Sequence, residues 1–335
     1  MSFPASRRAA FAMLAVLSVT ACTIQRWQPA KSAAMDDHSA HMSAMDMSAA
    51  QPAPHAGVGG QGSPTLPPSA ATAAARVANS PRHAEWVKVA WEPGSSDSLM
   101  AWIVYPMSAT KAPVIVVIHE IFGLSTWVRS VADQMAAEGF IAIAPDLNSR
   151  VRGGPSTVEL SSDSARKLIS GVTYGDRNKG IVAVASYAMN QPSAEKRYGV
   201  VGYCWGGSTV FAHAVFNGQG LKAAVAYYGL PYMNGATPIA DSLAKIQVPT
   251  MLLNGSADAR IGAAMPAVDS AMKALKKDYV GKNYDGAVHG FLRAQDDQPA
   301  PGQQANPTTQ QANLAATKDA WPLTVAFFKK HLGVK

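Results

Sequence analysis

The pattern of apolar and polar positions changes near residue 83 of this 335-residue chain. From residue 23 to 82, Ala, Ser, Pro, Gly, Met and His dominate, and neither a helical nor a strand period persists. Such a segment buries too little apolar surface to offset the entropy lost on ordering it. We therefore predict a disordered tether over residues 22–83 and one folded domain over residues 84–335.

Within the predicted domain, short apolar runs alternate with amphipathic stretches. The runs that predict strands are Leu99–Tyr105, Val114–His119, Phe140–Pro145, Tyr198–Tyr203, Ala223–Tyr228 and Thr250–Asn254, with a shorter one near Lys282–Tyr284. The stretches that predict helices are Trp127–Glu138, Lys179–Met189, Ser208–Phe216, Ala264–Lys276 and Ala312–Leu332, the last kinked or restarted at Pro322. This alternation predicts an α/β fold with a mostly parallel central sheet and helices on both faces. Ligands of such sheets bind beyond the carboxyl ends of the strands.

The N-terminal 22 residues have the pattern of an export signal. Arg7 and Arg8 precede an apolar run over residues 9–21, which is too short to span a bilayer comfortably and has the length of a secretory core. The run ends Val19-Thr20-Ala21-Cys22, which resembles the lipobox of bacterial lipoproteins. We expect a signal peptide over residues 1–21 and a lipid-anchored protein, acylated at Cys22, facing the periplasm or exterior. The alternative is plain cleavage, which would leave a soluble periplasmic protein.

Charge and cysteine content narrow the class of protein. Lys and Arg outnumber Asp and Glu by 29 to 22, but the excess is spread along the chain, so we expect no nucleic-acid partner. The two cysteines, Cys22 and Cys204, cannot form a disulfide framework. We expect a monomer without a cofactor.

A Met- and His-rich stretch at residues 35–47 suggests a different function. Thioether and imidazole groups are copper ligands, and a flexible chain can wrap an ion. The simpler interpretation is a low-complexity linker without metal. If copper binds there, the protein is a lipid-anchored copper-binding module whose folded domain serves as a scaffold.

The second cysteine lies in a motif typical of catalytic nucleophiles. Gly202-Tyr203-Cys204-Trp205-Gly206 follows a predicted strand and precedes a predicted helix. The G-x-nucleophile-x-G pattern makes a sharp strand-to-helix turn that lifts the central side chain above the sheet. There it lies at a helix N-terminus, which favours a thiolate. A buried structural thiol is the alternative.

An acid and a histidine follow in the order that this motif predicts. Asp258 lies in a turn just beyond the strand ending at Asn254, and His289 follows the short strand near Tyr284. His289 can act as base and acid, and Asp258 can fix its tautomer. Asp241 and Asp269 are competing acids, but the pattern places both on surface helices or loops.

These residues, with other motifs, resemble the dienelactone hydrolase family of α/β-hydrolases. The matching stretches, in family order, are His119-Glu120-Ile121-Phe122-Gly123, Pro145-Asp146-Leu147, the cysteine motif, Tyr227-Tyr228-Gly229 and His289-Gly290-Phe291. The resemblance implies a Cys204–Asp258–His289 triad and an oxyanion hole from the amides of Ile121 and Trp205. It also implies that Glu120 is an accessory carboxylate that contacts the nucleophile and takes its proton when substrate arrives.

The resemblance further implies arginines that hold a substrate carboxylate. Arg150 and Arg293 lie at matching offsets, and Arg152 could replace Arg150. A Gln-, Pro- and Asn-rich loop predicted over Ala294–Gln311 departs from the family pattern next to Arg293. We expect a cysteine-dependent hydrolase of lactones or esters whose substrates bear a carboxylate. A domain that keeps the fold only as an interaction surface is the remaining alternative.

Overall fold

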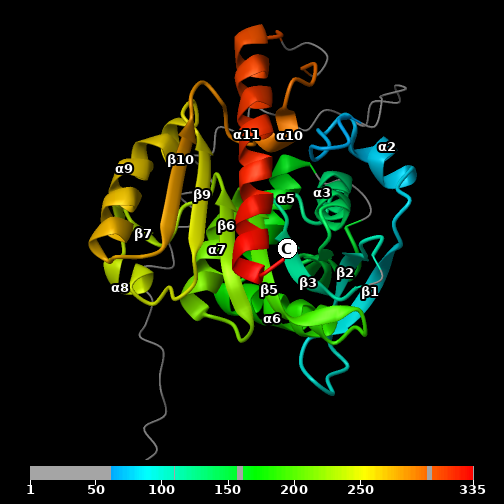
Figure 1. Ribbon diagram of the computed structural model, residues 1–335. Coiled ribbons are helices and arrows are strands. Elements are labelled where there is room, and N and C mark those ends of the chain that lie inside the picture. The colour runs from blue at the N-terminus through cyan, green and yellow to red at the C-terminus, as the bar shows by residue number, and fades with distance from the viewer. Residues whose placement is uncertain (1–61, 109, 157–160, 300–303, 335) are drawn as a thin grey trace, which may run out of the picture. The chain divides into compact units, whose positions relative to one another are not determined.

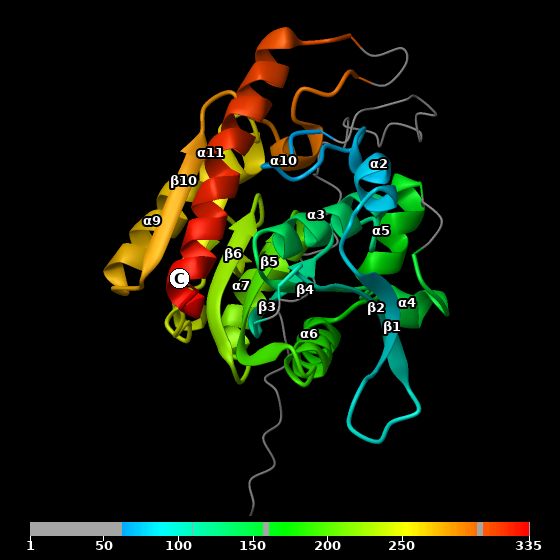
Figure 2. The same ribbon diagram turned by 45° about the vertical axis from the view of Figure 1, so that its right-hand side comes forward.

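The computed structural model describes residues 62–108, 110–156, 161–299 and 304–334 (Figures 1 and 2). Its strands are β1 (Ala84–Ala90), β2 (Ser98–Val104), β3 (Ala112–Ile118), β4 (Ile141–Pro145), β5 (Ala194–Tyr203), β6 (Leu221–Tyr227), β7 (Met233–Asn234), β8 (Thr237–Pro238), β9 (Thr250–Gly255) and β10 (Tyr279–Tyr284). Its helices are α2 (Ala73–Ala78), α3 (Thr126–Ala137), α4 (Ser149–Arg152), α5 (Ser162–Ser170), α6 (Tyr174–Met189), α7 (Trp205–Phe216), α8 (Ala240–Leu243), α9 (Ala259–Ala274), α10 (Phe291–Ala294) and α11 (Pro307–Leu332). Among the described residues, no helix is both long and apolar enough to cross a membrane.

An eight-stranded sheet forms the centre of the described chain. The strand order is β1-β2-β4-β3-β5-β6-β9-β10. Strands β1, β2 and β4 pair antiparallel in sequence, and every other neighbouring pair in this sheet is parallel. The predicted α/β-hydrolase fold with a mostly parallel sheet is therefore confirmed.

Helices cover both faces of the sheet, and this explains the unbroken apolar runs. Helices α3 and α11 pack on one face, while α6, α7 and α9 pack on the other (Figure 1). Every residue of β3 and β4 is buried, because a strand covered on both faces has no solvent-facing side. The parallel strands all end at the same edge of the sheet, so the residues that follow β3, β5, β9 and β10 are brought to one side.

The structure differs from the sequence prediction in the C-terminal helix. Helix α11 begins at Pro307, five residues before the predicted start, so the loop predicted over Ala294–Gln311 is shorter than expected. Asn306 caps the helix by accepting a hydrogen bond from the Thr309 amide, and Pro307 occupies the first turn, where its missing N–H is tolerated. The helix also continues through Pro322 instead of restarting there.

The predicted disordered tether is wrong for residues 62–83. Leu66 and Ala73 are buried, and the Arg76 side chain donates hydrogen bonds to Gln134 of α3 and to the Ser63 carbonyl. Arg82 forms an ion pair with Asp133, also on α3. The folded part of the chain therefore begins at least 20 residues before the predicted boundary. The segment's own pattern hides this, because the apolar surface and hydrogen-bond partners that order it belong to the domain.

Candidate active site

Cys204 occupies a strained turn between β5 and α7. Its φ of 58° and ψ of −117° lie in a region that costs L-residues free energy and is typical of functional sites. The turn needs small neighbours. A Cβ on Gly202 would lie 2.3 Å from the Gly206 carbonyl oxygen, and one on Gly206 would lie 2.5 Å from the His119 carbonyl oxygen. The predicted strand-turn-helix geometry of this motif is therefore present, with Cys204 at its apex.

His289 and Asp258 lie together beyond the ends of β10 and β9. The Nδ1 atom of His289 is 2.5 Å from Oδ2 of Asp258. Asp258 also caps α9 by accepting a hydrogen bond from the Ile261 amide at 3.2 Å. Burial opposes ionisation of Asp258, but these hydrogen bonds hold the pKa of its carboxyl below the usual range. Asp258 is thus held as a carboxylate that faces one side of the imidazole.

The other side of the imidazole faces the nucleophile. Among the described residues, the buried Nε2 atom of His289 has no hydrogen-bond partner. Burial alone would lower the pKa of His289, but the sulfur of Cys204 and the carboxylate of Asp258 raise it to about 10. The structure therefore brings together the three residues predicted for the triad.

Glu120 and Arg293 form a second buried pair at this edge of the sheet. Glu120 follows β3, and Arg293 lies on α10, directly after the loop that carries His289. Nε of Arg293 is 3.1 Å from Oε2 of Glu120, and the two side chains are only 10% and 4% exposed. Burial would lower the pKa of Arg293, but Glu120 holds it above the usual range. The predicted accessory carboxylate is thus paired with one of the two predicted substrate arginines.

The amides predicted for the oxyanion hole are unoccupied by protein acceptors. Within the described residues, the N–H groups of Ile121 and Trp205 donate to no backbone or side-chain acceptor. The His119 ring stacks on the Trp205 ring with centroids 5.5 Å apart, and its Nδ1 is 2.5 Å from the Glu120 carbonyl oxygen. Its Nε2 accepts a hydrogen bond from the Leu147 amide. This buried histidine, to which the sequence assigned no role, fixes the loop carrying Glu120 against Trp205.

Two tyrosines beside the site carry buried hydroxyl groups without a hydrogen-bond partner among the described residues. They are Tyr203 and Tyr228. Tyr228 has a left-handed φ of 40°, and its ring centroid lies 5.0 Å from that of His289. Burial raises the pKa of both phenols, and Glu120 raises it further. The Tyr227-Tyr228-Gly229 motif marked this stretch in the sequence, but nothing in the pattern indicated unpaired hydroxyls.

A buried cation that the sequence did not indicate lies behind Trp205. The Arg177 guanidinium is stacked over the Trp205 ring, 4.3 Å from its centroid. The groups with which it interacts are neutral, namely the Val172 carbonyl, the Thr209 hydroxyl and the Tyr174 ring. Burial lowers the pKa of the Arg177 guanidinium, and no carboxylate of the described residues offsets this cost. No spacing rule in the sequence could have found it.

Arg150 does not join this group. Its Nε donates to Asp97 at 3.1 Å, its guanidinium stacks on Trp91 at 3.8 Å, and its Nη1 lies 3.6 Å from Asp176. None of these partners belongs to the triad, to the Glu120–Arg293 pair or to the oxyanion amides. The reason is the β1–β2 turn, whose Asp97 lies 53 residues earlier in the chain and binds the guanidinium.

Cys22 and residues 35–47 lie outside the described residues.

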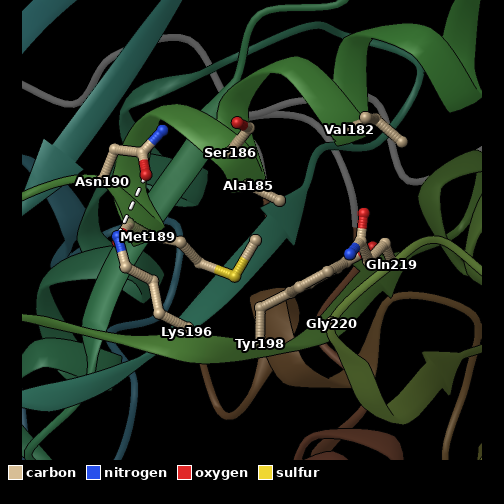
Figure 3. A pocket seen from close by; sticks show the side chains of 9 residues that line it. All are labelled: Val182, Ala185, Ser186, Met189, Asn190, Lys196, Tyr198, Gln219 and Gly220. Atoms are coloured by element: carbon tan, nitrogen blue, oxygen red, sulfur yellow. Dashed lines mark hydrogen bonds between the residues drawn. The ribbon is translucent and has the colours of Figure 1, made fainter.

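A cavity of about 280 Å³ lies at the opposite ends of the parallel strands, between α6 and the starts of β5 and β6 (Figure 3). The Lys196 ammonium donates to the Asn190 side chain and to the Met189 carbonyl at one end, and Gln219 lies at the other. Lys196 already donates hydrogen bonds within the protein, and Cys204, Asp258 and His289 lie beyond the opposite ends of the strands. This cavity is therefore separate from the candidate active site.

Comparisons with known proteins agree with the motifs. The sequence pattern of the dienelactone hydrolase family matches residues 99–332. A protein of Escherichia coli (strain K12) named "Putative carboxymethylenebutenolidase" is 28% identical over 276 residues, covering 80% of this chain and 96% of that protein. A Bradyrhizobium protein named "Probable 2-oxo-3-(5-oxofuran-2-ylidene)propanoate lactonase" is 26% identical over 258 residues, covering 74% and 94%.

A solved structure shares the fold. The crystal structure titled "Putative Dienelactone Hydrolase" from Klebsiella pneumoniae superposes with a TM-score of 0.60 at 24% identity, covering 74% of this chain and 99% of that chain. The family match spans well over half of the chain and includes every motif at the candidate active site. The chain therefore belongs to the dienelactone hydrolase family, whose members are hydrolases of esters and lactones.

Proposed function

We propose that this protein is a cysteine-dependent hydrolase of lactones and esters in which Cys204 is the nucleophile. One observation carries the proposal: His289 is held by Asp258 on one side and interacts with Cys204 on the other, at the strained apex of a strand-to-helix turn. This is the arrangement that nucleophilic catalysis requires, with a base beside the nucleophile and a third group that orients the base.

In the first half of the reaction, the Cys204 thiolate attacks the substrate carbonyl carbon. Either Glu120 or His289 takes the thiol proton. The carbonyl oxygen becomes negatively charged and accepts hydrogen bonds from the amides of Ile121 and Trp205, which have no protein acceptor to give up. Collapse of this intermediate breaks the ester C–O bond and leaves a thioester on Cys204, and the departing alkoxide or enolate takes up the proton that Glu120 or His289 had accepted.

In the second half, His289 activates water against that thioester. A thioester carries no charge, so its formation removes the Cys204 contribution that raises the pKa of His289. The imidazole is then more easily neutral and accepts a proton from water, while Asp258 keeps the Nδ1 proton in place. Attack of the hydroxide releases the acid and regenerates the thiolate. The nucleophile's own charge therefore switches His289 between its two states.

Arg293 is the group we propose to bind a substrate carboxylate. A carboxylate that replaces Glu120 at the guanidinium keeps the buried charge paired, and it frees Glu120 to accept the Cys204 proton. The printed name of the Bradyrhizobium relative, a propanoate lactonase, supports a lactone that bears a carboxylate.

The nucleophile is tested by assaying the Cys204→Ala variant on an enol lactone and on a 4-nitrophenyl ester. Cys204→Ala should abolish turnover of both, because the alanine side chain cannot form the acyl intermediate. Iodoacetamide should label the wild-type protein near neutral pH, the lactone should protect it, and the label should map to Cys204. Enol-lactone turnover at the wild-type rate by Cys204→Ala would exclude Cys204 as nucleophile.

We further propose that the protein is exported, acylated at Cys22 and held as a monomer at a bacterial membrane. Mass spectrometry of the N-terminal peptide tests the acylation. The expected peptide begins at acylated Cys22, and Cys22→Ala should move the protein from the membrane to the soluble fraction. An unmodified Cys22 in a membrane-free protein would contradict the anchor.

A further inference from the structure

Residues 66–71, which we call the strap, run between α3 and the turn that carries Arg293. Four consecutive residues of the strap, Leu66 to Ser69, are buried, although the segment has the composition of a linker. In Figure 2 this stretch runs beside α10 before it enters α2. Burial of an irregular segment requires partners for its backbone groups, and these partners are specific.

On one side, the strap is bonded to the turn that carries Arg293. The Ala70 amide donates to the Arg293 carbonyl at 2.8 Å. The Gln295 side chain donates to the Pro67 carbonyl at 2.8 Å, and the Ala71 amide donates to Oδ2 of Asp297 at 2.9 Å. Three hydrogen bonds thus hold three residues of the turn, one of them at the backbone of Arg293 itself.

On the other side, the strap is bonded to α3, which follows the loop carrying Glu120 and Ile121. The indole N–H of Trp127 donates to the Pro68 carbonyl at 3.0 Å. The Trp127 ring packs edge-on against Tyr203, the residue before the nucleophile, with centroids 5.0 Å apart. The strap therefore joins α3, which follows the loop carrying Glu120, to the turn that carries Arg293.

Helix α10 is too short to hold Arg293 by itself. It has four residues, between Gly290 and Gln295, which both have positive φ. A single helical turn is marginal without external contacts, because it fixes many dihedral angles for few hydrogen bonds. External bonds to this turn reduce the conformational freedom that Arg293 must lose when it binds an anion.

We propose that the strap is a positioning element for Arg293 and thereby sets the preference of the enzyme for carboxylate-bearing substrates. The inference rests on the proposed role of Arg293 as the carboxylate-binding group. The chain segment that leads to the predicted membrane anchor is then part of the specificity apparatus and not only a tether.

The test weakens the strap bonds without touching the triad. In the full chain, Gln295→Met and Asp297→Ala remove two of the side-chain partners of the strap. The matched control is Gln310→Met, because Gln310 donates to the carbonyls of Asp296 and Asp297, in the same turn, and makes no bond to the strap. Asp297→Asn keeps an acceptor oxygen and should rescue the Asp297→Ala defect.

The readout is kcat and KM for a carboxylate-bearing enol lactone and for a neutral ester. Strap variants should raise KM for the anionic lactone about tenfold and leave both parameters for the neutral ester within about twofold, whereas the control should resemble wild type. A purely structural role of the strap would lower activity on both substrates. If the ratio of kcat/KM for the anionic lactone to that for the neutral ester does not change, the inference is overturned. Circular dichroism and thermal unfolding check that each variant folds.

Arg293→Gln separates the two proposals. The quantity compared is the ratio of kcat/KM for the anionic lactone to kcat/KM for the neutral ester. If Arg293→Gln lowers this ratio and the strap variants do not, the strap inference alone is wrong. If it leaves the ratio unchanged, Arg293 does not bind the carboxylate, and the strap inference is overturned with it. If both lower the ratio, the strap acts as proposed.

Discussion

Two arginines that the sequence treats alike lie in very different surroundings. Arg293 and Arg150 each pair with a carboxylate and stack on an aromatic ring, Phe122 in one case and Trp91 in the other. The Arg293 side chain is 10% exposed and its partner 4%, whereas the Arg150 side chain is 29% exposed and its partner 49%. Burial is therefore the difference between the candidate active site and the β1–β2 turn.

This difference decides what each pair can do. Solvent screens the Arg150–Asp97 pair, so the pair contributes little to the free energy of unfolding. The Arg293–Glu120 pair has lost its water, so neither charge can be left alone without a cost of several kcal/mol. A buried arginine in that position therefore binds another anion only by exchanging it for Glu120.

The largest effect should come from the other buried pair of the candidate active site, Asp258 and His289. Asp258→Asn should lower kcat about 10³–10⁴-fold, because an amide can stabilise the wrong imidazole tautomer. Asp97→Asn, the same change in the β1–β2 turn, should leave kcat within about twofold. Steady-state kinetics on an enol lactone measures both. Equal losses of kcat in the two variants would contradict the functional difference between the candidate active site and the β1–β2 turn.

Removal of one buried charge should have the next largest effect. Arg293→Met leaves Glu120 buried and unpaired, so we expect a loss of about 3–5 kcal/mol of unfolding free energy. Adding Glu120→Gln removes the orphaned charge and should restore part of that loss. Urea denaturation measures the free energy of unfolding. If the single variant is as stable as wild type, the pair is solvated and the comparison with Arg150 fails.

The strands and the turn around the candidate active site could be predicted because their local sequence pattern reflects their own burial and packing. Continuous apolar runs indicated strands covered on both faces, and the small residues flanking Cys204 indicated a turn that admits no Cβ. Helix α5 was missed, although Ala165, Leu168 and Ile169 have the i, i+3, i+4 apolar spacing that predicts a helix. In each of these places, the local pattern of apolar and small residues matches the burial and packing of the element in the structure.

Long-range partners could not be predicted in the same way. Nothing near Arg150 indicates that Asp97 would bind it, and nothing in the Pro- and Ala-rich segment around Leu66 indicates that α3 would bury it. The resemblance supplied the offset of Arg150 but not the turn between β1 and β2 that captures its guanidinium. Such contacts depend on the tertiary arrangement, which pattern and spacing do not encode.

The pKa of His289 should show an effect of intermediate size when Cys204 is replaced. It should titrate near pH 10 in the wild-type protein, because the Cys204 sulfur and Asp258 stabilise the imidazolium. In Cys204→Ala it should fall by about one unit or more, which corresponds to about 1.4 kcal/mol per unit. Below its pKa the ring is charged, so the variant should lose that charge at lower pH than wild type.

NMR of the His289 ring protons follows this titration, and Ser is a useful second replacement. Cys204→Ser keeps a hydroxyl of similar size but is neutral at these pH values, so it should behave like Cys204→Ala. A titration near pH 10 in both variants would mean that Asp258 alone raises the pKa. The proposed switch of His289 on acylation of Cys204 would then lose its basis.

The smallest effect should come from Arg150. Arg150→Met keeps an unbranched stem against Trp91 and removes the charge, so the free energy of unfolding should change by at most about 1 kcal/mol. Because Asp97 lies in an exposed turn, its carboxylate remains hydrated when the arginine is lost, in contrast to Glu120. For a carboxylate-bearing lactone, kcat/KM should stay within about twofold of wild type, since none of the partners of Arg150 is a group of the candidate active site. A fall of tenfold or more that spares neutral esters would instead show that Arg150 leaves Asp97 to bind substrate, and the two arginines would then act together despite their different burial.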